Sequence, residues 1–473
     1  MSETSATAVM WFRNDLRTHD NAALFAACRH KNIIPIYILD EHTGRALGLA
    51  KKWWLHHALN KLNENIERLG GKLILRKGDE ANILKQLIKK TNAGSIYWNR
   101  RYEPDCIKRD IALKSNFVNE GIDVKSFSGH LLHEPTQLQT RSGTPFRVFT
   151  PFWKALDIEV TDALPIPQPD TLPQQNHDIE SDKLTEWNLC PANPNWASGF
   201  AEFATPGENA AQKTLQRFLA GQISDYKESR NFPALSGTSS LSPYLTFGEI
   251  SPRQIWCESL TKDGGQAFRR QLGWRDFSYH LLFHNPNLSD ANFNSKFDNF
   301  DWSDNSDGLE CWKKGLTGYP IVDAGMRELW QTGYMHNRVR MIVASFLTKH
   351  LLIDWRIGEQ WFWDTLLDAD PANNAASWQW VAGSGADASP YYRIFNPIIQ
   401  GKKFDSDGIY VRRHLPELRN LNNKFIHTPW EASDAELESA SITLGKDYPH
   451  PIVEHSLARN RALSAYQRMK EAA

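Results

Sequence analysis

The chain opens with the apolar run Ala8-Val-Met-Trp-Phe12, and a second run, Ile33-Ile-Pro-Ile-Tyr-Ile-Leu39, follows it. Both have the length and continuous hydrophobicity of a strand buried on two faces. Between such runs, Lys51–Leu69 carries apolar residues every three or four positions, the spacing of a helix. Three further strand-like runs are Lys72–Leu75, Ser95–Trp98 and Val124–Phe127. This alternation predicts a doubly wound parallel sheet with helices on both faces, forming an α/β domain over residues 1–130.

The remaining chain is expected to form a linker and a second domain. Residues 131–205 lose the alternating pattern, and Leu164–Pro173 holds four prolines, which exclude helix and central strand. We expect this stretch to be an interdomain linker. Beyond it, helical periodicity dominates and predicts an all-α domain over residues 206–473, with helices at Ala210–Ala220, Arg253–Leu260, Gly265–Phe283, Ile321–Gln331 and His336–Lys349.

Composition limits the functional classes. The 54 basic and 55 acidic residues give a net charge of -1, so the chain does not hold nucleic acid by bulk positive charge, although a local basic patch is compatible with it. No apolar run spans a membrane and no signal peptide is evident, so we expect a cytoplasmic protein. The five cysteines are far apart and form no C-x-x-C pair, so we expect neither a disulfide framework nor a cysteine-based zinc site.

The familiar signatures of several enzyme classes are missing. There is no G-x-G-x-x-G after the first strand and no Walker A sequence, which leaves a Rossmann dehydrogenase or a P-loop NTPase unsupported. Neither H-E-x-x-H nor G-x-S-x-G occurs, so metal-dependent or Ser-His-Asp hydrolysis is disfavoured. Tryptophan is abundant instead: 18 are present, eleven of them from Trp256 onward. Each of these rings can serve core packing, a planar ligand or an electron path.

Four segments carry candidate site residues. The Gly-flanked loop Gly237–Pro243 offers donors for a phosphate, or it is a plain turn. The second segment is expected to place a polar and aromatic stripe on one face of a helix, because its residues recur at helical spacing. The third is expected to place an amide beside an adaptable apolar side chain on a shared helix face. The fourth, Asp368–Trp380, concentrates acceptors, amides and rings around small residues. The second segment contributes Gln271, Trp274, Arg275 and Ser278, and the third contributes Asn337 and Met341.

Together these motifs resemble the DNA photolyase/cryptochrome family over residues 8–465, nearly the whole chain. The similarity is greatest to microbial, class I-like cyclobutane-pyrimidine-dimer photolyases, and it implies FAD, active in its reduced form, bound inside the helical domain. The residues that carry the resemblance are Trp11–Arg17, His19–Asn21, Thr238–Ser242, Gly318–Asp323, Met335–Arg338 and Asn374–Trp380.

The resemblance implies roles for individual residues. Asn374 corresponds to the position that faces the flavin N5, and Arg340 is expected to pair with Asp368. Ser240 replaces the arginine that the family carries in its phosphate loop. The implied cofactor-binding set is Tyr226, Thr238, Ser239, Ser240, Leu241, Ser242, Arg340, Asp368, Ala369, Asp370 and Asn374.

The resemblance also implies DNA containing pyrimidine dimers, double- or single-stranded, as the partner, with the dimer flipped out of the helix. The implied lesion contacts are Gln271, Trp274, Arg275, Asn337, Arg338, Met341 and Trp380. Trp302, Trp355 and Trp378 correspond to an electron chain that reduces the flavin. We further expect a monomer that associates with the nucleoid when it is bound to DNA.

Two departures from the family affect substrate and pigment. Gln271 stands where most bacterial dimer photolyases carry Glu, and (6-4) photolyases share this Gln but place histidines at positions 337 and 341. A (6-4) photolyase or a cryptochrome photoreceptor is therefore the alternative, although no long tail follows Trp430. Glu103 resembles an antenna contact. Methenyltetrahydrofolate, a deazaflavin and no second pigment all remain open.

Overall fold

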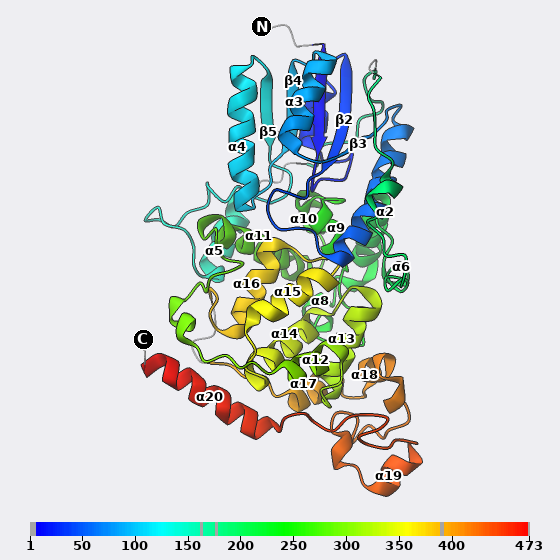
Figure 1. Ribbon diagram of the computed structural model, residues 1–473, viewed down its shortest axis with the longest axis vertical. Helices are drawn as coiled ribbons and strands as arrows, with labels where there is room; N and C mark the ends of the chain where they lie inside the picture. The colour runs from blue at the N-terminus through cyan, green and yellow to red at the C-terminus, as the bar shows by residue number, and fades with distance from the viewer. Residues whose placement is uncertain (1–5, 161–163, 176–177, 388–391, 472–473) are drawn as a thin grey trace.

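The computed structural model describes residues 6–160, 164–175, 178–387 and 392–471. Its N-terminal part is a five-stranded sheet in the order β3-β2-β1-β4-β5, with every neighbouring pair parallel (Figure 1). The strands are β1 (Thr7–Phe12), β2 (Asn32–Leu39), β3 (Ile74–Lys77), β4 (Ser95–Asn99) and β5 (Asp123–Phe127). The predicted doubly wound parallel sheet is confirmed.

Both faces of this sheet are buried, as its continuous apolar runs predicted. Ala8, Met10 and Phe12 of β1 belong to one core cluster, whereas Val9 and Trp11 belong to another. Successive side chains of a strand point to opposite faces, so helices must cover both. These helices are α1 (Ala22–Ala27), α2 (Leu49–Arg68), α3 (Glu80–Thr91) and α4 (Pro104–Asn119).

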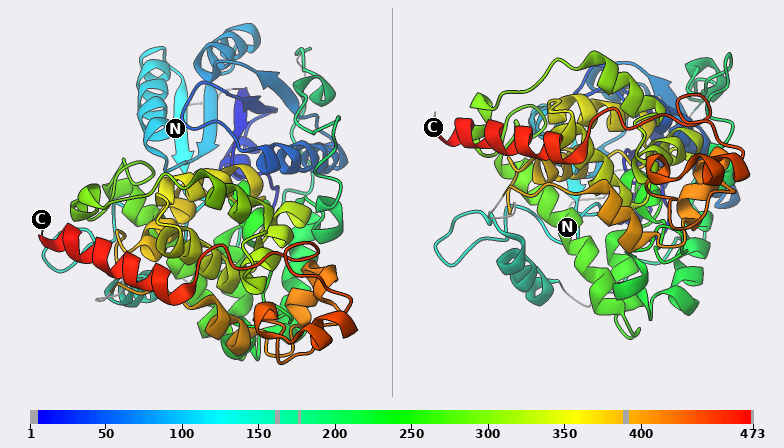
Figure 2. Two further views of the ribbon diagram at one scale, coloured as in Figure 1. Left: turned by 60° about the horizontal axis from the view of Figure 1, so that its bottom comes forward. Right: turned by 90° about the horizontal axis from the view of Figure 1, so that it is seen from below.

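The C-terminal part is helical, and its last helix lies along the outside of the other helices (Figure 2). This confirms the predicted all-α architecture. Its α-helices are α7 (Glu208–Arg217), α8 (Tyr226–Ser229), α9 (Ser242–Phe247), α10 (Pro252–Ser259), α11 (Gly265–His284), α12 (Ser306–Lys314), α13 (Pro320–Thr332), α14 (Asn337–Ser345), α15 (Trp355–Thr365), α16 (Pro371–Ala382), α17 (Pro397–Phe404), α18 (Ile409–His414), α19 (Asp434–Ser439) and α20 (His455–Glu471). Shorter helical turns are η2 (Phe218–Gln222), η3 (Ser295–Asn299), η4 (Phe346–His350), η5 (Pro416–Leu418) and η6 (Pro429–Glu431).

Residues 131–205, where the alternating pattern is lost and an interdomain linker is expected, contain helices that the sequence pattern did not indicate. This segment contains α5 (Phe149–Glu159), α6 (Phe200–Phe203) and the turn η1 (Leu184–Trp187). Helix α5 buries Phe149, Phe152, Trp153 and Leu156, which recur at helical spacing, against α11. The short length of this apolar face and the neighbouring prolines hid it in the sequence. Residues 164–173 contain no helix or strand, as predicted.

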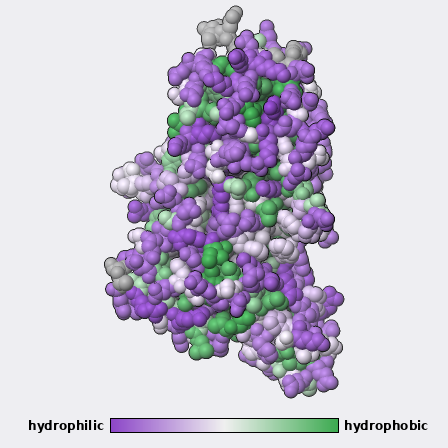
Figure 3. Space-filling view, in the orientation of Figure 1, coloured by the Kyte–Doolittle hydropathy of each residue, from purple (hydrophilic) through white to green (hydrophobic). Residues whose placement is uncertain are grey.

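The two parts meet at the carboxyl end of β1. The backbone N–H of Leu16 donates to the carbonyl of Phe247, and the Arg17 guanidinium donates to the carbonyl of Gly248. Glu208 accepts from the backbone N–H and the hydroxyl of Thr18. The loop after β1 therefore rests on the helical part. The face in Figure 3 is largely hydrophilic over both parts, with apolar side chains in separate patches.

Candidate functional site

A cavity of about 570 Å³ lies inside the helical part. Residues from α8, α9, α11, α14, α15 and α16 line it, together with the loops that precede α9, α14 and α16. All but three of the residues predicted for the site are in its wall: Tyr226, Thr238, Ser239, Ser240, Leu241, Ser242, Gln271, Trp274, Arg275, Asn337, Arg338, Arg340, Met341, Asp368, Ala369, Asp370, Asn374, Trp378 and Trp380. Trp302, Trp355 and Glu103 do not line it.

The loop before α9 is tightly folded against α8. A Cβ added to Gly237 would lie 2.6 Å from the carbonyl oxygen of Ser229, so only glycine fits there. Ser240 has a φ of 53°, a conformation that few non-glycine residues adopt. The next four residues after Gly237 and the first residue of α9 all line the cavity. A ligand can therefore approach both their hydroxyls and their backbone.

Asp368 presents an oxygen without a partner to this cavity. Its Oδ2 accepts from Nη2 of Arg340 at 2.9 Å and from Oγ of Ser242 at 2.5 Å. Its Oδ1 is buried and has no hydrogen-bond partner among the described residues. An unpaired buried carboxylate oxygen is costly, so this atom is suited to accept an N–H or O–H from a ligand. The predicted pairing of Arg340 with Asp368 is confirmed.

Asn374 has a fixed amide orientation. Its Nδ2 donates to the backbone carbonyl of Glu359 at 2.9 Å and to Oε1 of the same residue at 2.7 Å. Both amide hydrogens are thereby used on α15, and Oδ1 is left as an acceptor in the cavity wall. The sequence reasoning missed Glu359, because a single acid in a helical pattern carries no signal of its own.

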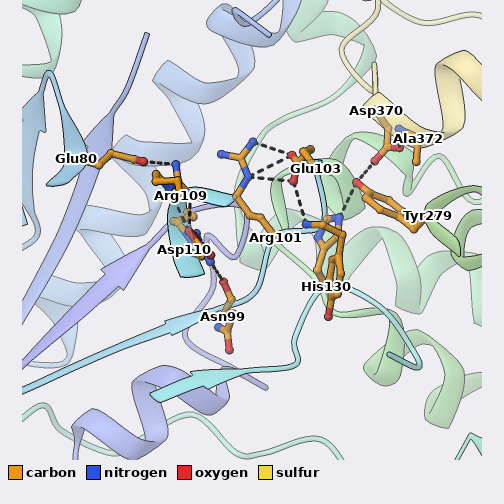
Figure 4. Close-up of polar contacts among 12 residues, drawn as sticks. Glu80, Asn99, Arg101, Glu103, Arg109, Asp110, His130, Tyr279, Asp370 and Ala372 are labelled. Carbon is orange, nitrogen blue, oxygen red and sulfur yellow. Dashed lines mark hydrogen bonds and ion pairs between the residues drawn. The ribbon is translucent and has the colours of Figure 1, made fainter. Parts of the chain in front are cut away.

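A buried hydrogen-bond chain fixes the start of α16 (Figure 4). Asp370 caps this helix, since its Oδ1 accepts from the backbone N–H of Ala372 and of Asn373, and its Oδ2 accepts from the Tyr279 hydroxyl at 2.5 Å. The same hydroxyl lies 2.9 Å from Nε2 of His130. Burial and the nearby Asp370 raise the pKa of Tyr279, so its hydroxyl keeps its proton. Neither Tyr279 nor His130 was singled out from the sequence.

The predicted stripe on α11 forms one wall of the cavity. Gln271, Trp274, Arg275 and Ser278 all line it, so the expected shared face is confirmed. The Trp274 ring stacks on Phe149 of α5 with centroids 3.6 Å apart and an interplanar angle of 11°. One face of Trp274 is therefore covered by protein.

Another part of the wall comes from α14 and α16. Asn337 and Met341 both line the cavity, as their spacing predicted. Arg338 donates through Nη2 to Oδ1 of Asn231 at 2.6 Å, and Trp380 donates through Nε1 to the Asp387 carbonyl at 3.1 Å. These hydrogen bonds fix a cation and a ring beside the same space.

The three tryptophans predicted as an electron chain differ in their exposure. Trp378 is buried and lines the cavity, Trp355 is fully buried, and Trp302 is half-buried, with its ring 4.5 Å from that of Phe300. Trp378 also contacts Trp312 edge-on at 6.2 Å, a neighbour that the sequence reasoning missed. Core packing explains each ring equally well, so the chain stays a prediction.

Glu103 is occupied by protein partners. Arg101 donates to both carboxylate oxygens, and the Tyr102 N–H donates to one of them. Burial alone would raise its pKa, but Arg101 lowers the pKa of Glu103 to about 2. A different pair of aromatic groups, one exposed and one half-buried, lies on the helical part. The rings of Trp330 and Trp361 are parallel within 9° with centroids 6.1 Å apart, Trp330 is 51% exposed, and Lys313 lies 5.1 Å from the Trp361 ring.

The described residues contain no cluster of three or more His, Cys, Asp or Glu side chains that could hold a metal ion. No helix in the described part of the chain is long and apolar enough to cross a membrane.

Comparison with known proteins places both parts of the chain. A family model described as DNA photolyase matches residues 8–170, and one described as the FAD binding domain of DNA photolyase matches residues 268–468. The deoxyribodipyrimidine photo-lyase of Agrobacterium fabrum is 52% identical, with 100% of each chain covered. Cryptochrome-2 of Arabidopsis thaliana is 35% identical over 98% of this chain and 79% of its own length. The crystal structure of a bacterial class III photolyase from Agrobacterium tumefaciens superposes with a TM-score of 0.96 at 52% identity, covering 100% of this chain and 99% of the other.

Proposed function

The chain belongs to the DNA photolyase family, and from its cavity we propose how it works as a light-dependent deoxyribodipyrimidine photo-lyase that splits cyclobutane pyrimidine dimers. The observation that carries the proposal is the shared cavity. It brings the predicted cofactor residues and the predicted lesion residues to one space, so a pigment and a flipped-out pyrimidine dimer can be close together. The similarity to the class III enzyme leads us to propose this subclass in place of the class I-like one expected from the sequence.

The residues of the cavity fit FAD, the cofactor of the family. The Gly237–Ser242 loop offers hydroxyls to phosphates, Arg340 and Asp368 offer a cation and a free acceptor, and Asn374 offers Oδ1. When bound in its reduced form, FAD would supply the light-driven electron transfer that splits the dimer. This chemistry needs no general acid or base from the protein for bond cleavage, in agreement with the missing hydrolytic signatures.

The protein's own work is to extrude and hold the dimer. Trp274 and Trp380 offer rings on which unstacked bases can pack, and stacking of this kind stabilises a flipped base. Arg275 and Arg338 supply positive charge beside them, and Gln271 supplies a neutral amide. Because a dimer already distorts the duplex, its extrusion costs less free energy than the extrusion of undamaged pyrimidines.

The two alternative functions are a (6-4) photolyase and a cryptochrome photoreceptor. A (6-4) photolyase of this family carries histidines at positions 337 and 341, where this chain has Asn and Met. A cryptochrome photoreceptor is the other alternative, since Cryptochrome-2 of Arabidopsis thaliana is 35% identical to this chain. We also propose that Trp302, Trp355 and Trp378 carry electrons inward, a route supported by the half-buried Trp302 at its outer end and by Trp378 in the cavity wall at its inner end.

We further propose a domain organisation and a setting for the reaction. Residues 1–130, first expected to bind the antenna through Glu103, would form the N-terminal α/β domain, 131–205 the connection and 206–473 the catalytic domain, which would also carry the second pigment at Trp330 and Trp361. The protein would act as a monomer on dimers in double- or single-stranded DNA, in the cytoplasm and at the nucleoid.

The decisive experiment illuminates flavin-loaded, reduced protein with blue light in the presence of an oligonucleotide that carries one thymine dimer. We expect intact thymines to appear only with light. A parallel reaction with a (6-4) photoproduct should show no repair. Unchanged dimer in a sample with full flavin absorbance would contradict the proposal.

For the second pigment we propose the parallel Trp330 and Trp361 rings in place of Glu103 as the site. An acidic planar pigment such as methenyltetrahydrofolate or a deazaflavin would stack on them with Lys313 nearby. We expect Trp361→Ala to lose absorbance from a second pigment while the flavin band is kept. Trp196→Ala is the control, because its ring is tilted by 33° from Trp330. Retention of the second pigment in Trp361→Ala would return Glu103 to consideration.

A further inference from the structure

A loop of the N-terminal part is packed tightly onto α15 of the helical part. This loop, residues 40–48, connects β2 and α2. Nε1 of Trp363 donates to the Ala46 carbonyl at 2.8 Å, and a Cβ added to Gly48 would lie 1.9 Å from the Trp363 carbonyl oxygen. The Arg45 guanidinium lies 4.2 Å from the centre of the Trp363 ring. Such close approach gives the loop a single position on the helix.

From this loop, Arg45 forms a two-pronged ion pair with Glu359. Its Nη1 lies 2.7 Å from Oε1, and its Nη2 lies 2.8 Å from Oε2. Nη2 also donates to Oε1 of Gln360 at 2.6 Å. The Glu359 side chain is only 4% exposed. A paired fork of this kind fixes the plane of the carboxylate and supplies the charge that a buried carboxylate needs.

Glu359 passes this orientation to Asn374. The same Oε1 that accepts from Arg45 also accepts from Nδ2 of Asn374 at 2.7 Å. An unconstrained amide can turn by half a rotation, which exchanges its donor and its acceptor. With Glu359 held, Nδ2 points to α15 and Oδ1 remains for the cavity.

We propose that Arg45 is a positioning residue for the flavin, acting through Glu359 and Asn374; this inference rests on the proposed binding of FAD with Asn374 beside its N5. Arg45 keeps Oδ1 of Asn374 available to a ring N–H, which flavin carries at N5 when it is reduced. A residue of the α/β domain, 314 positions before Glu359, thereby favours the reduced cofactor that repair requires.

Removal of Arg45 would destabilise the reduced flavin whether Glu359 stays in place or turns away. If Glu359 stays in place, its carboxylate lacks a cation and places uncompensated negative charge beside the reduced flavin. If the Glu359 side chain turns away, only the bond from Nδ2 to the Glu359 backbone carbonyl still holds the Asn374 amide, so the opposite orientation, in which Nδ2 repels the N5–H, becomes less costly. Both outcomes destabilise reduced flavin relative to oxidised flavin.

The test measures the midpoint potential of the bound flavin by spectroelectrochemistry, without DNA. We expect Arg45→Ala to lower the ratio of reduced to oxidised flavin at a fixed potential at least tenfold. We also expect the reduced flavin of this variant to oxidise faster in air. Arg45→Lys, which keeps the charge but loses the fork, should give a smaller shift. Gln360→Ala removes another bond of the same loop without touching Asn374 and should leave the ratio unchanged.

A double variant separates positioning from general loosening. If Arg45 acts through Glu359, Arg45→Ala should add no shift in a Glu359→Gln background. An unchanged ratio in both Arg45 variants, an equal shift in Gln360→Ala, or a full further shift in the double variant would overturn the proposal. Should Arg45→Ala fail to fold, Arg45→Lys decides by its own ratio. A colourless protein, or one with a normal potential that repairs no dimers, would instead contradict the proposed function.

Discussion

Asp276 shows how burial couples one carboxyl group to stability. Burial, only partly offset by Arg275, raises its pKa to about 7. In the unfolded chain the carboxyl titrates near 3.8, so between these values the folded state holds one proton more than the unfolded state. The stability contributed by this group is thus present below pH 3.8 and is lost as the pH rises to about 7.

We therefore expect Asp276→Asn to remove this dependence on pH. Oδ2 of Asp276 accepts from the backbone N–H of Leu132 and His133, while Oδ1 has no hydrogen-bond partner, so an amide can keep both bonds. Between pH 4 and 7 the free energy of unfolding of the wild type should fall by up to about 1.4 kcal/mol per pH unit relative to the variant. Urea unfolding at several pH values measures this, and parallel pH profiles would refute it.

Trp380 is a second residue whose role can be measured directly. If its ring packs on the extruded dimer, Trp380→Ala should weaken binding of dimer-containing DNA by about 1–3 kcal/mol. Trp380→Phe keeps a stacking face and should recover most of the affinity. Fluorescence anisotropy with damaged and undamaged oligonucleotides gives both values, and wild-type affinity in the alanine variant would leave the ring a packing role only.

Sequence patterns indicated segments in which acceptors, amides and aromatic rings are concentrated, such as Asp368–Trp380. They did not indicate Glu359, Arg45 or Tyr279, which are ordinary residue types in ordinary patterns. Each acquires its role from a partner distant in sequence, and no local pattern carries that information.

At the scale of elements, the loop before α9 depends on one glycine. The carbonyl of Ser229 occupies the space that a Cβ at Gly237 would need. Gly237→Ala must displace this loop, at a cost of about 1–3 kcal/mol, and we expect FAD affinity to fall about tenfold or more. Gly221→Ala is the matched control, because a Cβ there meets nothing within 4 Å. Equal FAD retention in both variants, measured after gel filtration, would remove the loop from the cofactor site.

Elements with a strong period were predicted well, and the misses have physical causes. The α11 prediction, Gly265–Phe283, agrees with the observed Gly265–His284 to one residue. Helix α5 was missed because its four apolar residues lie between a glycine-containing loop and prolines. The third strand was placed two residues early, because it is a short edge strand whose end is set by pairing with β2 and not by hydrophobicity.

At the scale of the whole molecule, sequence pattern gave the two architectures but not their docking. The alternation of runs predicted a parallel sheet, whereas the contacts of Leu16, Arg17 and Thr18 with the helical part depend on residues about 190 to 230 positions away. Docking matters for function, since it brings Arg45 onto α15. Local sequence patterns carry no information about this contact between residues distant in sequence.

The net charge of the chain leads to a prediction about the salt dependence of DNA binding. A chain of charge -1 has no general attraction for DNA. Binding must come from local cations such as Arg230, Arg275 and Arg338 in the cavity wall. Affinity for dimer-containing DNA should then fall steeply as salt rises, with a slope of about -0.9 in log–log form for each phosphate contacted. Arg338→Gln should lower the slope by about 1. Lys89→Gln changes the net charge equally but lies on α3 of the other domain, so its slope should match that of the wild type. Equal slopes in all three proteins would show that Arg338 contacts no phosphate.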